Sequence, residues 1–289
     1  MIHLLQKPLL GVPVNWSHPL ARGLVGCYLM NEGGGNKIYD LSGNQNRGTF
    51  VNHTFWTPGK FGNCLSFDGT DDCVSVPDND IFSFGNSVSD KPFSLSAWIY
   101  IKSLTLLQPI VSKYWNNTGA ICEWDFEILT TGALYAQCLD DSPSIRLKIT
   151  GSRILALNTW YHVSFTYDGS SNTNGMNLYV NGIRDLAPTR ALQGTYVAMH
   201  NTTSPVEIGS IIRGNAANDV YFNGLIDDCS IYNRALTDAE IARLYREPFA
   251  MFDRPSIGLL YVPPAGGQTI LDYERSHRGA ARGVLVGVP

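Results

Sequence analysis

The segment 222–245 constrains the fold more than any other, because a strand pattern passes directly into a short capped helix. Period-two alternation predicts a strand with two distinct faces. One face carries Leu225, Asp227, Cys229 and Ile231, and the other carries Ile226, Asp228, Ser230 and Tyr232. A helix follows, since Thr237 and Glu240 have the spacing of a capping box and Pro248 ends the pattern. We therefore expect a strand-rich domain that closes with a strand and one helix.

Other segments have patterns that fit the same kind of domain. A Gly-rich strand runs into an early loop, a Pro-Gly turn leads to a strand ending in Phe-Asp-Gly, and the central strands are rich in aromatic residues. These segments are 23–44, 56–77, 93–99 and 159–182. With 222–245, they occur in the order found in LamG-like (laminin G-like) domains. Over residues 23–246 the chain thus resembles a member of the concanavalin A-like lectin/glucanase jelly-roll superfamily.

The resemblance implies an all-β fold, a two-sheet antiparallel jelly-roll sandwich with one short C-terminal helix. Residues 160–167 alternate as such a sandwich requires, with one apolar face per strand. We place the sandwich at residues 23–247. The Pro-containing stretch 1–22 and the Pro/Gly-rich stretch 248–289 lack this pattern. We expect them to be extended N- and C-terminal arms that contact other copies of the chain or a capsid or tail protein.

Composition excludes several functional classes. Charged residues make up only 16% of the chain, the net charge is −4, and there is no basic run, so nothing indicates nucleic-acid binding. No stretch approaches the ~20 apolar residues of a membrane span. Residues 1–10 lack the basic start and continuous apolar run of a secretory signal, which predicts synthesis in the cytoplasm without a signal peptide. The six cysteines lie in predicted strands without a CxxC pair, so we expect free, buried thiols.

The segment 123–127 carries the strongest enzymatic pattern. In a strand, Glu123, Asp125 and Glu127 share one face over ~13 Å of backbone. The superfamily resemblance implies a comparison with the laminarinase and agarase class of retaining glycoside hydrolases, where such acids act as nucleophile, assisting acid and acid/base. That reaction needs two carboxyl groups about 5–5.5 Å apart. The favoured alternative is a LamG strand with its apolar residues inward and the three acids facing solvent.

Oxygen-rich turns predict one structural calcium ion, which takes about 6–8 oxygen ligands. The resemblance implies an ion between the first loop and the last strand, with Asp40, Asn44 and Asp228 as ligands. In the alternative, Asp40 and Asn44 close a turn by bonds to the backbone. The six histidines lack the sequence spacing of a zinc site. Further oxygen-rich groups are Asp68 with Asp71 and Asp72, and Asp227 with Asp228.

Aromatic and amide side chains in loop-like sequence are candidate glycan ligands, since rings stack on sugars and amides give paired hydrogen bonds. These candidates are Tyr114, Trp115, Asn116, Tyr196 and Asn201. Each of them fits equally well at the edge of the core or in a subunit contact, and the sequence does not choose among these roles.

The resemblance implies a non-catalytic glycan- or protein-binding adhesion module rather than an enzyme, with a cell-surface glycan as one expected partner. The arms and the free cysteines expected of a cytoplasmic protein also suggest a role by analogy. The chain would be a virion-associated structural protein, such as a bacteriophage capsid or tail decoration, on the virion surface. The second interpretation is a retaining glycoside hydrolase that uses Glu123, Asp125 and Glu127. A structural protein without any ligand is the third.

Overall fold

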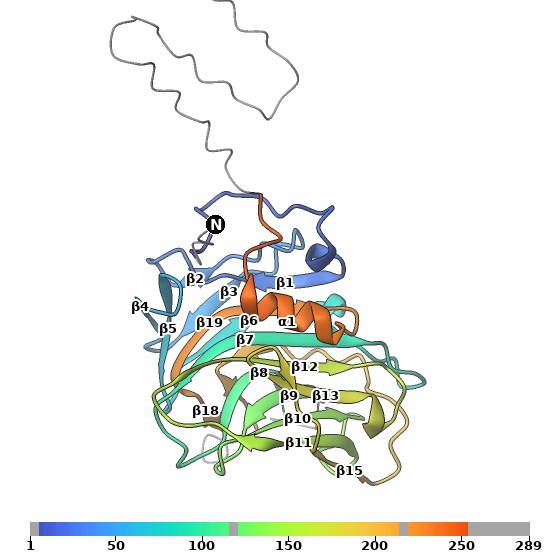
Figure 1. Ribbon diagram of the computed structural model, residues 1–289. Coiled ribbons are helices and arrows are strands. Elements are labelled where there is room, and N and C mark those ends of the chain that lie inside the picture. Colours follow the sequence, from blue (N-terminus) through green and yellow to red (C-terminus); the bar gives the residue numbers. More distant parts are fainter. Residues whose placement is uncertain (1–5, 116–120, 214–218, 254–289) are drawn as a thin grey trace, which may run out of the picture.

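The computed structural model describes residues 6–115, 121–213 and 219–253 of the 289-residue chain. Two large antiparallel sheets pack face to face, and α1 lies across the outer side of one of them (Figure 1). The expected all-β, two-sheet jelly-roll sandwich with one short helix after its last strand is confirmed.

The first sheet has eight strands. Its order is β14 (Ile183–Arg184), β13 (Met176–Val180), β12 (Trp160–Tyr167), β7 (Phe93–Ile101), β19 (Asn223–Tyr232), β5 (Asn63–Asp68) and β4 (Phe55–Pro58), with β1 (Leu24–Tyr28) also paired to β19. The hairpin turn between β13 and β14 places Asn181 at φ 52° and Gly182 at φ 75°. Asn and Gly suit this turn, because both tolerate the positive φ that matches the twist of the two strands.

The second sheet has nine strands. Its order is β15 (Thr189–Gln193), β11 (Arg146–Ile154), β10 (Ala133–Leu139), β9 (Ile121–Ile128), β8 (Gln108–Trp115), β16 (Val206–Ile208), β6 (Cys73–Val76), β3 (Gly48–Val51) and β2 (Lys37–Ile38). A small separate pair, β17 (Ser210–Ile211) and β18 (Val220–Tyr221), packs on β8. Three short 3-10 turns are η1 (Pro19–Ala21), η2 (Asp80–Phe82) and η3 (Thr173–Gly175).

The core fills the space between the two sheets and is rich in aromatic rings. Phe93 stacks on Phe84 with ring centroids 4.4 Å apart and contacts Trp124 from the opposite sheet. Such ring pairs add to the burial of apolar surface, which is the main stabilising contribution. All six cysteines are free, buried and inside strands, as expected. His162 packs within β12 against Ser96, and burial lowers its pKa to about 3.

The strand and helix expected at 222–245 are β19 and α1 (Asp238–Arg246). Thr237 and Glu240 form the predicted capping box, and α1 packs on the first sheet where Tyr245 stacks on Trp98. Strict alternation along β19 is wrong, however. The register shifts between Asp227 and Ser230, and Asp228 has a φ of 50°. A β-bulge of this kind moves the following side chains to the other face, so the core contains Ile226 as well as Cys229 and Ile231.

The described residues before and after the sandwich pack against each other and against its outer surface. Val14 and Phe252 form an isolated β-bridge, and Asn15 N donates to Met251 O at 2.8 Å. A second apolar cluster joins them to β1, β19 and α1; it includes Val14, Leu20, Ala21, Leu24, Tyr232, Ile241, Leu244, Met251 and Phe252. Residues 6–22, expected to be part of an extended arm, therefore lie on the sandwich as part of the folded body. The arm expected at 248–289 lies outside the described residues beyond position 253.

Within the part of the chain that the structure describes, no helix has the length and hydropathy needed to cross a lipid bilayer.

Candidate functional site

A row of polar side chains crosses the outer face of the nine-stranded sheet. The strand registers place one residue from each of six neighbouring strands in line. From β11 to β6 these residues are Lys148, Gln137, Asp125, Ser112, Glu207 and Ser75. The neighbours in sequence along β9 and β10, such as Phe126 and Ala136, belong to the core. The row therefore lies on the face that points away from the core.

The strands β17 and β18 cover one half of this row. Ser112 Oγ donates to the carbonyl oxygen of Ser210 in β17 at 2.8 Å. A small apolar cluster continues the contact; its buried members are Tyr114, Cys122, Leu139, Ile211 and Val220. The other half of the row, over β10, β11 and β15, is the more open one, because Lys148 and its neighbours there are only half-buried.

Four side chains form a connected hydrogen-bond network at this open half. Tyr135 Oη donates to Gln137 Oε1 at 2.9 Å, and a guanidinium nitrogen of Arg146 donates to the same oxygen at 3.0 Å. Arg146 Nε also donates to Gln193 Oε1 at 3.0 Å. Tyr135, Arg146 and Gln193 are half-buried. A planar cation, one amide and an aromatic ring are thus held in fixed positions at the surface, with the buried Gln137 amide beneath them.

Asp125 and Glu127 lie beside the network on β9. Gln137 Nε2 donates to Asp125 Oδ2 at 2.5 Å, whereas one oxygen of each carboxyl group has no hydrogen-bond partner among the described residues. Burial raises the pKa of Asp125 to about 7, although the Gln137 bond and the charges of Arg213 and Arg146 lower it. Burial, followed by the charge of Asp125, raises the pKa of Glu127 well above its usual range. Near neutral pH this pair holds less negative charge than two free carboxylates would.

Glu123 does not share this face. The register of β8 and β9 shifts where Lys113 pairs with Trp124 and Tyr114 pairs with Cys122, which leaves Glu123 as the extra residue of a bulge. Its Oε1 atom instead receives hydrogen bonds from the backbone and hydroxyl of Thr202 and from the Ser83 hydroxyl, and lies 2.9 Å from the Lys113 ammonium.

Two expectations for the acidic strand are therefore wrong. The three carboxyl groups do not line one face, because the bulge separates Glu123 from Asp125 and Glu127. Nor do they face solvent, since Glu123 and Asp125 are fully buried and Glu127 is 3% exposed. Alternation in the sequence carries no signal for a one-residue bulge.

The predicted glycan ligands are not brought together. Tyr114 is buried within β8 and Trp115 ends that strand half-buried, so neither lies in a loop. Asn116 lies outside the described residues. Tyr196 and Asn201 lie between β15 and β16, as expected for a loop, and bond to Asp90 and Asp80, respectively. The role of this set in binding stays a prediction, and sequence reasoning missed Gln137, Arg146 and Gln193.

Of the residues predicted to bind calcium, Asp40 and Asn44 bond to the backbone of β1, and Asp228 lies on the neighbouring strand β19. The Asp40 carboxylate accepts hydrogen bonds from the backbone of Cys27, Ser42 and Asn46 and from the Ser42 hydroxyl. The Asn44 side chain donates to the carbonyl oxygen of Val25 at 3.1 Å. These are the local bonds expected if the two residues close a turn. Burial raises the pKa of Asp228 to about 7, with Asp227 adding to the rise. The calcium ion stays a prediction.

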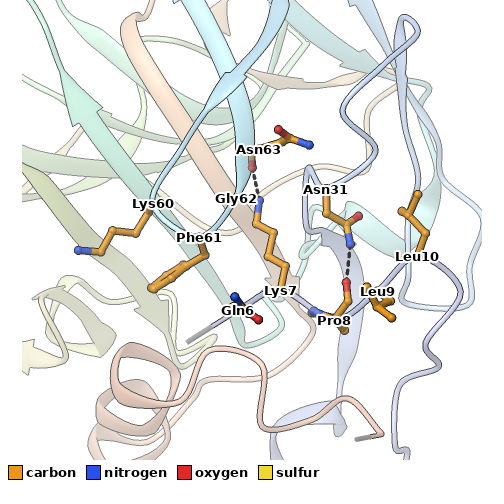
Figure 2. A pocket seen from close by; sticks show the side chains of 10 residues that line it. All are labelled: Gln6, Lys7, Pro8, Leu9, Leu10, Asn31, Lys60, Phe61, Gly62 and Asn63. Carbon is orange, nitrogen blue, oxygen red and sulfur yellow. Dashed lines mark hydrogen bonds between the residues drawn. The ribbon is translucent and has the colours of Figure 1, made fainter. Parts of the chain in front are cut away.

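One pocket of about 470 Å³ lies between the N-terminal segment and the turn before β5 (Figure 2). Its lining includes Lys7, Leu9, Asn31, Lys60 and Phe61. Figure 2 shows that Lys7 points across the pocket toward the backbone of Asn63, while the Lys60 side chain points away from it. Asn31 donates to the carbonyl oxygen of Pro8. Lys7 and Asn31 thus hold the N-terminal segment in place.

Comparison with known proteins identifies the family to which this fold belongs. The family model described as the concanavalin A-like lectin/glucanases superfamily matches residues 68–242. No curated protein sequence is significantly similar to the chain. Many solved structures are similar.

Three solved structures show the extent of the similarity. The binding domain of Paraclostridial Mosquitocidal Protein 1 has a TM-score of 0.58 and 19% identity over 80% of this chain and 53% of that one. A second structure is Domain 4 of AbnA, a GH43 extracellular arabinanase from Geobacillus stearothermophilus, in complex with arabinotriose. It has a TM-score of 0.53 and 19% identity, and the match covers 77% of this chain and 98% of that one. The binding domain of Botulinum Neurotoxin DC in complex with SialylT has a TM-score of 0.55 and 16% identity, and the match covers 78% of this chain and 52% of that one. The chain spans about half the length of the two toxin domains, and at these identities the similarity establishes the fold.

Proposed function

Because the chain belongs to the concanavalin A-like lectin/glucanase superfamily, we propose that it is a non-catalytic module that binds a glycan on the outer face of its nine-stranded sheet. The observation that carries the proposal is the hydrogen-bond network in which the buried Gln137 connects the half-buried Tyr135 and Arg146, with Gln193 bonded to Arg146. Sugars present adjacent hydroxyl groups and apolar ring faces, which match paired planar donors and an aromatic side chain.

The network is organised before any ligand arrives. Gln137 is fixed by three groups on three neighbouring strands, since it accepts from Tyr135 on β10 and Arg146 on β11 and donates to Asp125 on β9. Prior ordering lowers the entropy that binding would otherwise cost. Two similar structures support a glycan as the ligand, because they were solved in complex with arabinotriose and with SialylT.

A binding role is favoured over hydrolysis by the position of Glu123. A retaining glycoside hydrolase needs two carboxyl groups that flank the bond that breaks, one as nucleophile and one as acid. Here Glu123 is turned to Lys113 and Thr202, and only Asp125 and Glu127 remain on the outer face. Burial raises the pKa of both groups, whereas a retaining enzyme pairs one protonated carboxyl group with one that stays ionised.

The test is glycan binding by the full chain. An array of neutral and acidic oligosaccharides identifies a ligand, and calorimetry then measures its affinity. Arg146→Ala should weaken binding at least about tenfold, the scale of a lost hydrogen bond to a charged group. Arg153→Ala is the matched control, because Arg153 lies on the same strand but donates to the Arg184 carbonyl in the other sheet. Equal loss in both variants, or no glycan bound at all, would rule out this site.

A finer proposal concerns the setting in which the module works. We propose that it is a virion-associated decoration protein that other copies or a capsid or tail protein hold through its terminal segments. The six free, buried thiols support folding in a reducing cytoplasm. The mass of the native assembly, with labelling of the protein on purified particles, tests this. A monomer that associates with no particle would contradict it.

A further inference from the structure

Two turns that are far apart in sequence meet at the start of β4. The antiparallel register of β3 and β6 pairs Val51 with Cys73. The residues that follow Val51 therefore lie beside those that precede Cys73. His53 comes from the first turn, between β3 and β4, and Asp71 and Asp72 come from the second, between β5 and β6.

The imidazole of His53 and the carboxyl groups of Asp71 and Asp72 converge. One ligand atom from each residue lies within 4.8 Å of the other two. Asp72 is fully buried and is held in place by backbone N–H groups, since Oδ1 accepts from His53 at 2.8 Å and Oδ2 accepts from Asp68 at 3.1 Å. A fixed buried carboxylate thus forms the base of the group.

The other two side chains are free to bind. Within residues 6–115, 121–213 and 219–253, the His53 ring and the Asp71 carboxylate take part in no hydrogen bond or ion pair. No lysine or arginine of these ranges forms an ion pair with Asp68 or Asp72 either. Among the described residues, the carboxyl groups gathered here therefore have no basic side chain as a counter-ion.

We propose that His53, Asp71 and Asp72 form a binding site for a divalent transition-metal cation such as Zn²⁺. Ligands at about 2.0–2.2 Å from one zinc ion lie no more than about 4 Å apart, so the three groups need to close up slightly, and the exposed His53 and half-exposed Asp71 side chains have the room to do so. An imidazole ligand favours zinc, copper or nickel over calcium and magnesium, which select oxygen ligands. Three protein ligands leave a position for water or for another molecule.

The experiment titrates Zn²⁺ into the full chain by calorimetry, after removal of metal with a chelator. One ion should bind per chain. His53→Ala should weaken binding at least about tenfold, since even changes outside the ligand set cost metal sites about 10–100-fold in affinity. Asp71→Asn should weaken it as well. Both side chains lie at the surface of turns, so the metal-free variants should melt at the same temperature as the original protein.

A second histidine provides the matched control. His200 is also half-exposed and lies near an aspartate, with its Nδ1 3.7 Å from Asp141. His200→Ala should keep the full affinity for Zn²⁺. The proposal is overturned if the original protein binds no zinc, or if His53→Ala binds it as tightly as His200→Ala does. Zinc should also raise the melting temperature of the original protein but not that of His53→Ala, because an ion that binds only the folded state stabilises it.

Discussion

Lys113 and Glu123 form a fully buried ion pair, with the ammonium nitrogen 2.9 Å from a carboxylate oxygen. Lys113 also donates to the carbonyl oxygens of Thr202 and Ser204 and to the carboxylate of Asp78. The pair joins β8 and β9 to the segment that leads into β16. This ion pair accounts for the bulge at Glu123. A buried ammonium group needs an anionic partner, and in a strictly alternating strand the Glu123 carboxylate would point to the outer face and away from Lys113.

Removal of the ammonium should strongly destabilise the fold. Lys113→Met leaves Glu123 without its counter-ion, and breaking a buried pair in this way costs about 3–5 kcal/mol. Burial already raises the pKa of Glu123, so at acidic pH the group becomes neutral and the loss should shrink. Chemical denaturation at pH 5 and pH 8 measures both effects. Lys148→Met, on the half-buried part of the outer face, is the control. If Lys113→Met loses no more stability than Lys148→Met does, the buried pair contributes little to the stability of the fold.

The stability of the protein should fall as pH rises from about 5 to 8. Burial raises the pKa values of Asp125, Glu207 and Asp228 to about 7. A carboxyl group with a raised pKa binds its proton more tightly in the folded state than in the unfolded state, so its contribution is present at low pH and is lost as pH passes through the folded value. Melting temperatures measured across this range test the direction.

Glu207→Gln isolates one of these groups. Glu207 is 2% exposed and accepts a hydrogen bond from Ser75 at 2.8 Å. The amide cannot ionise, so the variant should lose less stability between pH 5 and pH 8 than the original protein does. Glu32→Gln, at a half-exposed carboxyl group, should keep the original slope. Identical slopes for all three proteins would mean that Glu207 does not titrate in this range.

The large elements of this fold are readable from the sequence, whereas the local irregularities that build the site are not. The strand and helix at 222–246 follow from alternation and the Thr237–Glu240 capping box, which depend on neighbouring residues only. The bulges at Glu123 and Asp228 depend on which strands pair and in what register. Since a one-residue shift moves every later side chain to the other face, the acids predicted for one face were divided between two.

The candidate site depends on register in the same way. Gln137, Arg146 and Gln193 come from three strands, and no spacing in the sequence shows that β10, β11 and β15 are neighbours. The same is true of His53 and Asp72, which the pairing of β3 with β6 brings together. Tyr196 and Asn201 were predicted as glycan ligands because turn-rich sequence is easy to recognise. Their polar groups, however, bond to aspartates within the chain.

Asp40 should stabilise the first loop whether or not calcium binds. Its carboxylate accepts three backbone N–H bonds and one hydroxyl bond, and Asp40→Ala leaves those donors unpaired at a cost of about 1–3 kcal/mol each where they stay buried. Thermal melts of both proteins, with calcium and with chelator, test this. A lower melting temperature for Asp40→Ala in chelator supports the turn. A difference between the two proteins that appears only with calcium would instead support the ion.

The N-terminal segment should be required for stability as well as for any contact with other chains. Lys7 donates to the carbonyl oxygens of Met30 and Asn63 and to the carboxylate of Asp227, a residue of β19 that is fully buried. Burial raises the pKa of Asp227, and Lys7 is the largest influence that lowers it. Lys7→Met should therefore destabilise the protein by about 3–5 kcal/mol, as expected when a buried acid loses its partner.

The control is Lys60→Met, since Lys60 is exposed and lies near the same pocket without an ion pair among the described residues. If both variants unfold at the same denaturant concentration as the original protein, Lys7 does not hold the segment in place. Deletion of residues 254–289 then separates folding from assembly, because it leaves Lys7 and the Val14–Phe252 bridge intact. This truncated chain should keep its melting temperature, and light scattering should show a loss of higher assembly if the C-terminal arm mediates it.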